Sequence, residues 1–119
     1  MPRSRFPRGL YREGSEPDPR FSLANERTFL AWLRTALALL AAGVALEALE
    51  IPDDPALRFV AAAVFIALGL ASAVHSWFGW IGTERALRMG QPLSGTAFGS
   101  VIAVGVVVAG LIMAIGLWR

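Results

Sequence analysis

Three long apolar blocks dominate the sequence and restrict it to a membrane fold. They cover about residues 28–49, 57–81 and 96–118, and short stretches with prolines, glycines or charges separate them. About 20 apolar residues are enough for a helix to cross the hydrocarbon core. A chain of 119 residues that collects its 55% hydrophobic residues into blocks is typical of one membrane domain. We therefore expect an all-α polytopic membrane protein with three transmembrane helices.

The helix boundaries follow from the residues that flank the blocks. We expect helices over residues 22–49, 57–88 and 96–118, within a membrane domain of residues 21–119. Ser22 or Asn25 is the expected N-cap of the first helix, because both side chains accept hydrogen bonds from first-turn amides.

The stretch before the first block differs in composition from the rest. Residues 1–20 hold four prolines and charges of both signs, which predicts a flexible tail. No signal peptide is evident, because the first apolar block follows this charged stretch and is too long for a signal-peptide core. The first span should therefore remain in the mature protein.

The distribution of arginine predicts the orientation. Six arginines precede the first block, two lie in the second loop, and the first loop has four acids and only Arg58. Because cytoplasmic loops are enriched in arginine, the N-terminus and second loop should be cytoplasmic and the C-terminus outside, in the cell (inner) membrane. The four acids (Glu47, Glu50, Asp53 and Asp54) are better explained as a solvated loop than as a cation site.

Several function classes find no support in the sequence. There is no cysteine, phosphate-binding glycine loop, zinc-ligand spacing or dinucleotide fingerprint, so we expect no metal and no cofactor. The basic charge fits a cytoplasmic membrane face and requires no nucleic acid. Ser72, His75 and Ser76 lie on one helix without a carboxylate beside them, which does not favour a hydrolase. We therefore expect no enzyme.

Arg34 is the most unusual residue of the first block. It is the only charged residue from Thr28 to Leu46, and an arginine at the centre of a span costs about 2.5–3.5 kcal/mol on insertion scales. Arg27 lies seven residues earlier and so on nearly the same helix face, with Ala31, Ala38 and Ala41 near that stripe. Either Arg34 faces a polar interior, or its long side chain reaches back to the headgroups.

Other polar residues lie near the same depth or at the cytoplasmic mouth. His75 could form a second polar layer with Arg34, or hydrogen-bond a neighbouring carbonyl or hydroxyl. Glu84, Arg85 and Arg88 could pair with Glu26 and Arg27 across the mouth of a bundle, or form a solvated helix end. Small residues repeat at four-residue spacing in all three blocks, which favours close helix packing and a homo-oligomeric bundle.

Two segments resemble a known family. The stretch Leu23-Ala24-Asn25-Glu26-Arg27-Thr28-Phe29-Leu30-Ala31-Trp32-Leu33-Arg34-Thr35 resembles the hallmark of the YidH-like family of small three-span membrane proteins, domain of unknown function 202. Residues 84–93 resemble its second-loop pattern. The family is related to the membrane domain of the vacuolar transporter chaperone complex, where first-span helices surround a conduit lined by basic residues. The resemblance implies that Asn25, Glu26, Arg27 and Arg34 correspond to the motif that includes those positions.

These arguments lead to two functional hypotheses. The first is an oligomeric conduit or binding channel for an anion, phosphate-like or polyphosphate, with Arg34 as the inner selectivity residue, Arg27 as the entry residue and Glu26 as a gate or partner. Its partners would be the lipid bilayer, copies of itself and inorganic anions. The alternative is a structural subunit that binds another membrane protein through its small-residue faces and transports nothing.

Overall fold

The computed structural model describes residues 5–93, 95 and 97–118. All regular secondary structure in these residues is helical. The prediction of an all-helical chain is confirmed, and three of the described helices are long and apolar enough to cross a membrane. The elements are α1 (Arg8–Arg12), α2 (Pro19–Leu49), α3 (Pro55–Met89) and α4 (Phe98–Trp118).

The start of α2 differs from the expectation. The helix begins at Pro19, and its N-cap is Asp18, whose carboxylate accepts a hydrogen bond from the amide of Arg20 at 2.9 Å. Proline suits the first helical position because its missing N–H would have no helical partner there. The prediction that Ser22 or Asn25 caps this helix is therefore wrong, since both lie inside it. Residue 96, the expected start of the third helix, lies outside the described residues.

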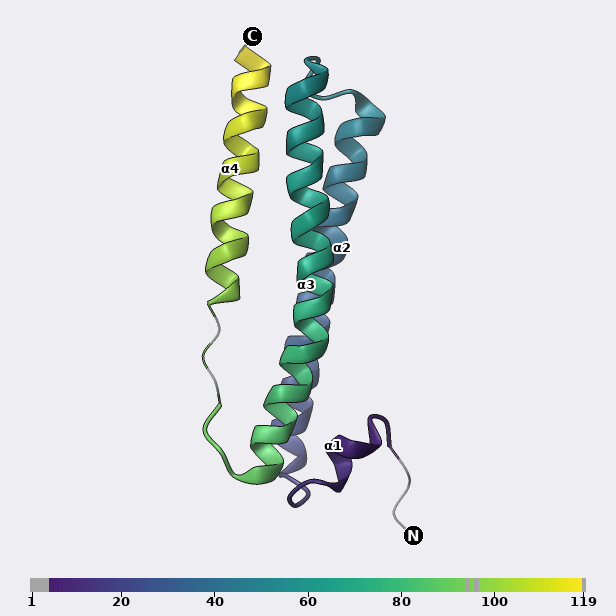
Figure 1. Cartoon of the computed structure of the whole chain (residues 1–119), viewed down its shortest axis with the longest axis vertical. Helices are drawn as coiled ribbons and strands as arrows, with labels where there is room; N and C mark the ends of the chain where they lie inside the picture. The colour runs from purple at the N-terminus through teal and green to yellow at the C-terminus, as the bar shows by residue number, and fades with distance from the viewer. Residues whose placement is uncertain (1–4, 94, 96, 119) are drawn as a thin grey trace.

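The long helices form an elongated bundle with extents of 63 × 25 × 20 Å. Figure 1 shows α2 and α3 side by side, with α4 along the other side of α3. The α2–α3 turn and the C-terminus lie at one end. The opposite end holds the N-terminal segment (residues 5–18), the first turns of α2 and the last turns of α3, and we call it the arginine-rich end.

Small residues allow α2 and α3 to approach closely. A Cβ atom built on Gly43 would lie 2.6 Å from a side-chain carbon of Ile66 and 3.0 Å from the carbonyl oxygen of Ala62. A Cβ on Gly69 would lie 3.0 Å from the carbonyl oxygen of Ala36. Backbones this close are typical of helices that associate inside a membrane. The side of α2 that faces α3 holds its buried residues (Asn25, Ala36, Leu39, Gly43 and Leu46).

α4 is attached by a much narrower seam. Ala109 is fully buried, Gly105 lies against Leu68, and Gly116 lies against Pro52 at the α2–α3 turn. Most of the remaining surface of α4 is exposed, and small residues such as Ala103 and Gly110 lie there among bulky ones (Val101, Val104, Val107, Val108, Leu111, Ile115 and Leu117). A single chain therefore leaves most of this helix without a protein neighbour.

The N-terminal segment is docked where the sequence predicted a flexible tail. The side chain of Leu10 is only 2% exposed. The guanidinium of Arg88, itself 6% exposed, donates to the carbonyl oxygens of Tyr11 and Glu13, each at 2.8 Å. Gly14 has a φ of 56°, and a Cβ atom there would collide with the carbonyl of Arg88. Residues 1–4 of the predicted tail lie outside the described residues.

Candidate functional site

The two arginines of the first span lie on the face of α2 that points away from α3. Arg34 comes nine positions after the buried Asn25, and at about 100° per residue this places it about half a turn from Asn25. Arg27 lies about 10 Å from Arg34 along the helix axis, on nearly the same face. Both side chains are exposed on the isolated chain. The predicted stripe of basic residues is thus on the outer surface of the chain.

Arg34 has no compensating group in the part of the chain that the structure describes. Neither a hydrogen bond nor an ion pair reaches its guanidinium from residues 5–93, 95 or 97–118. Its neighbours on the same face include the small exposed Ala31, Ala38 and Ala41, together with the larger exposed Leu30 and Leu37. An alanine-rich surface permits a second helix to approach closely. The outer face of α2 is therefore the candidate functional surface.

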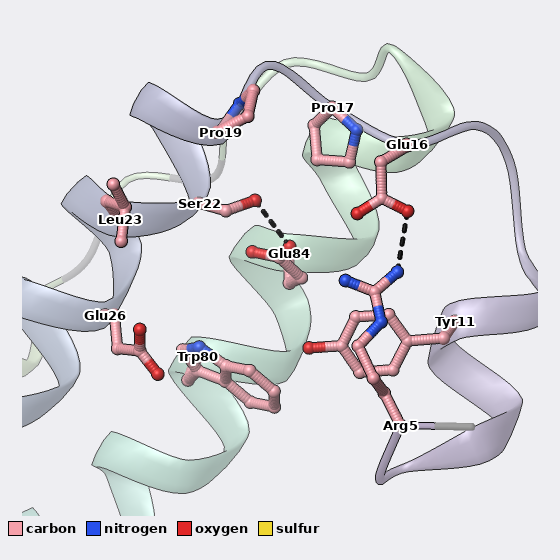
Figure 2. Close-up of a pocket in the computed structure, with 10 residues that line it drawn as sticks. All are labelled: Arg5, Tyr11, Glu16, Pro17, Pro19, Ser22, Leu23, Glu26, Trp80 and Glu84. Atoms are coloured by element: carbon pink, nitrogen blue, oxygen red, sulfur yellow. Dashed lines mark hydrogen bonds and ion pairs between the residues drawn. The ribbon is translucent and has the colours of Figure 1, made fainter. Parts of the chain in front are cut away.

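Asn25 belongs to a different environment from Arg27 and Arg34. Its side-chain amide donates to the carbonyl oxygen of Trp80 at 3.0 Å and to the carboxylate of Glu84 at 3.3 Å. The hydroxyl of Ser22 donates to the other oxygen of Glu84 at 2.7 Å, as Figure 2 shows. These bonds join α2 to α3 at the arginine-rich end. They also set the rotation of α2 that turns its arginines outward.

The charged end of α3 is neither paired with Glu26 and Arg27 nor fully solvated. Glu84 is 4% exposed and bonds to Ser22 and Asn25, while Arg88 bonds to the N-terminal segment. Arg85 remains exposed and pairs with the carboxylate of Glu13 at 3.0 Å. The sequence did not predict these N-terminal partners of Arg85 and Arg88. The charges of both signs before residue 20 were the one signal that could have indicated them.

The N-terminal segment brings its own charged groups to this end. The guanidinium of Arg5 donates to the carboxylate of Glu16 at 2.6 Å and lies 4.1 Å from the ring centroid of Tyr11. The bond from Arg5 lowers the pKa of Glu16 and raises that of Arg5. Burial raises the pKa of Tyr11, and the nearby charge of Glu84 raises it further.

His75 lies among aromatic rings. Its ring stacks on Phe98 at 4.3 Å between centroids and meets the edge of Trp32 at 4.8 Å. Arg34 does not line the cavity of about 210 Å³ beside His75. The neighbouring serines donate within their own helix, Ser72 to the carbonyl of Leu68 and Ser76 to that of Ala73. The structure therefore does not bring His75 and Arg34 into one polar layer.

The acids at the other end of the bundle have structural roles. The carboxylate of Asp54 accepts hydrogen bonds from the first amides of α3, and Glu47 lies 3.6 Å from the guanidinium of Arg58. Glu50 ends α2 in the left-handed conformation, with a φ of 55°. Across the described residues, no group of three or more His, Cys, Asp or Glu side chains could hold a metal ion.

Comparison with known proteins assigns the family. A family profile described as "Domain of unknown function (DUF202)" matches residues 20–86, which include α2 and most of α3. The chain is 42% identical to inner membrane protein YidH of Escherichia coli K12 over 114 residues, covering 90% of this chain and 98% of that protein. It is 44% identical to uncharacterized protein Rv2272 of Mycobacterium tuberculosis H37Rv over 99 residues, covering 82% and 80%. No solved structure matches the chain.

The relatives and the helices agree on the location. Inner-membrane relatives of nearly the same length, together with three apolar helices, indicate a multi-pass protein of the inner membrane. The match includes the outer face of α2 with Arg27 and Arg34, and the end of α3 with Glu84. The chain belongs to the family defined by DUF202, which includes inner membrane protein YidH.

Proposed function

We propose that the protein is a homo-oligomeric anion conduit in which the outer faces of several α2 helices surround a common axis. The observation that carries this proposal is Arg34, a guanidinium within an apolar span, exposed on the subunit surface and without a partner in the described chain. Copies of α2 around an axis would remove that charge from lipid and provide it with water or an anion.

The composition of the surface supports this arrangement. α2 presents alanines beside its arginines, and small residues let helices pack closely. α4 presents bulky valines, leucine and isoleucine, which are suited to contact lipid tails. The N-terminus and the α3–α4 connection would lie in the cytoplasm, as the arginine count favours, and the C-terminus outside.

Three charged residues of α2 receive a role in the conduit. Arg34 would be the inner selectivity residue, and Arg27 would attract anions at the cytoplasmic mouth. Glu26, exposed beside Arg27, would act as a gate or as its partner. Phosphate or polyphosphate is the preferred anion, because of the resemblance described above and because guanidinium groups bind phosphate oxygens well. Asn25 would position α2 and not line the path, since it bonds to α3.

Phosphate flux into proteoliposomes tests the proposal. Arg34→Ala should lower the flux at least about tenfold, while Arg34→Lys should keep part of it because the positive charge remains. Arg20→Ala is the matched control, since Arg20 lies on the same helix outside the apolar stretch and its side chain is 86% exposed. Wild-type flux in both Arg34 variants would remove the proposal.

A second candidate uses the same exposed face. α2 could bind a different membrane protein whose acidic group pairs with Arg34, making this protein a structural subunit without transport activity. Purification in a mild detergent separates the two candidates. A stoichiometric foreign protein that is lost in Arg34→Ala, together with no self-association, favours the subunit role, whereas a pure oligomer favours the conduit.

A further inference from the structure

A second site lies at the arginine-rich end, where α2 meets the N-terminal segment and the last turns of α3. A cavity of about 380 Å³ opens between the N-terminal segment, α2 and α3 (Figure 2). Three carboxylates line it, those of Glu16, Glu26 and Glu84, together with the side chains of Tyr11 and Trp80. Among the described residues of the lining, Arg5 is the only basic one. The lining therefore carries an excess of negative charge.

Glu84 is the most deeply buried of these three carboxylates. Its side chain is almost completely buried, and among the described residues its two oxygens accept hydrogen bonds only from the neutral Ser22 and Asn25. No ion pair reaches it from any residue that the structure describes. A buried carboxylate without a positive partner is costly, because neutral hydrogen bonds replace only part of its hydration. A cation that enters the cavity would supply the missing charge.

One cation of the chain, the guanidinium of Arg5, is already bound at the edge of the cavity. The guanidinium of Arg5 is bound to Glu16 at 2.6 Å and lies over the ring of Tyr11 at 4.1 Å. A carboxylate and an aromatic face are thus already holding an organic cation at the edge of the cavity. Glu26, Glu84 and Trp80 offer the same two kinds of group in the remaining space (Figure 2).

We propose that this cavity binds a primary ammonium group, with Glu26 and Glu84 as its charge partners and Tyr11 and Trp80 as its aromatic walls. The ammonium could belong to a free amine or to the ethanolamine headgroup of a lipid, because the cavity lies at the end of two membrane-spanning helices. The proposal does not depend on anion conduction. An anion is disfavoured by the three carboxylates of the lining.

Calorimetric titration of the full-length protein in an uncharged maltoside detergent tests the site with putrescine. Wild type should show saturable binding, and Glu26→Gln should weaken it about tenfold because one charge partner is lost. Glu26 is exposed, so this variant leaves the packing of the helices intact. Arg5→Gln should strengthen binding, because it removes the competing cation. Glu50→Gln is the matched control, since it removes a carboxylate at the other end of the bundle.

The source of the ammonium is distinguished by a second measurement. Native mass spectrometry should compare retention of phosphatidylethanolamine with that of phosphatidylglycerol by wild type and Glu26→Gln. Selective, Glu26-dependent retention of phosphatidylethanolamine assigns the site to a lipid headgroup, and putrescine binding without it assigns the site to a free amine. Absence of both, or equal binding by wild type and Glu26→Gln, overturns the proposal.

Discussion

The outer faces of α2 and α4 are both exposed on a single chain, yet only that of α2 carries charge. α2 presents Arg27 and Arg34 beside exposed alanines and leucines, whereas residues 98–118 of α4 contain no charged residue and expose mainly bulky aliphatic side chains. Lipid tails accommodate the second surface without penalty but not a lone guanidinium. The difference teaches that exposure on one chain does not by itself identify a lipid-facing surface, because the cost of that exposure depends on the side chains.

The largest effect is expected when an arginine is placed on the exposed face of α4, which has no charged residue. Val107 lies near the middle of α4 and is 60% exposed. Val107→Arg should reduce accumulation in the membrane severalfold, because it adds an insertion cost of about 2.5–3.5 kcal/mol on a helix without any charged residue. The measurement is the membrane-fraction yield of a fluorescent fusion, with Val107→Leu as the control. Wild-type yield of Val107→Arg would show that this face of α4 does not meet lipid.

An intermediate effect is expected when the alanine surface of α2 is enlarged. Ala38→Leu combined with Ala41→Leu should weaken self-association at least about tenfold, because the added methyl groups keep neighbouring helices apart. Val104→Leu combined with Val108→Leu adds volume to α4 and should leave association unchanged. Light scattering in detergent gives the mass of each assembly. Equal masses for the two double variants would contradict the assignment of α2 to the oligomer interface.

The smallest effect concerns how α2 and α4 are attached to α3. Gly43→Ala should lower the free energy of unfolding by about 1–3 kcal/mol, because the new methyl group meets the backbone carbonyl of Ala62. Gly105→Ala should be nearly neutral, because its methyl group meets only the flexible side chain of Leu68, and alanine favours the helix. Thermal unfolding followed by tryptophan fluorescence measures both. Equal shifts in Tm would mean that the two seams are equally tight.

The spans were predictable because hydropathy and length determine them. Apolar blocks of about 20 residues have few alternatives to membrane helices, and α2, α3 and α4 lie close to the predicted ranges. The predicted start of α2 was wrong because Ser22 and Asn25, whose side chains are suited to capping, lie inside the helix. The pair Asp18-Pro19 carries the stronger signal, since it combines a capping carboxylate with proline at the first helical position.

The candidate site was predictable only in part, because helix periodicity says which residues share a face but not what covers it. The seven-residue spacing places Arg27 and Arg34 together, and the nine-residue spacing could have separated Asn25 from Arg34. The partners of Glu84 and Arg88 lie 59 to 77 positions away in the chain. No local pattern specifies contacts between such distant segments. The docking of the N-terminal segment and the cavity beside it are therefore evident only from the three-dimensional structure.

The buried guanidinium of Arg88 imposes an order on biosynthesis. Its N–H groups donate to the carbonyl oxygens of Tyr11 and Glu13, so these residues can make their final contacts only after translation has passed residue 88. The docking of residues 11–13 is therefore a late step of maturation, which depends on the correct placement of the end of α3.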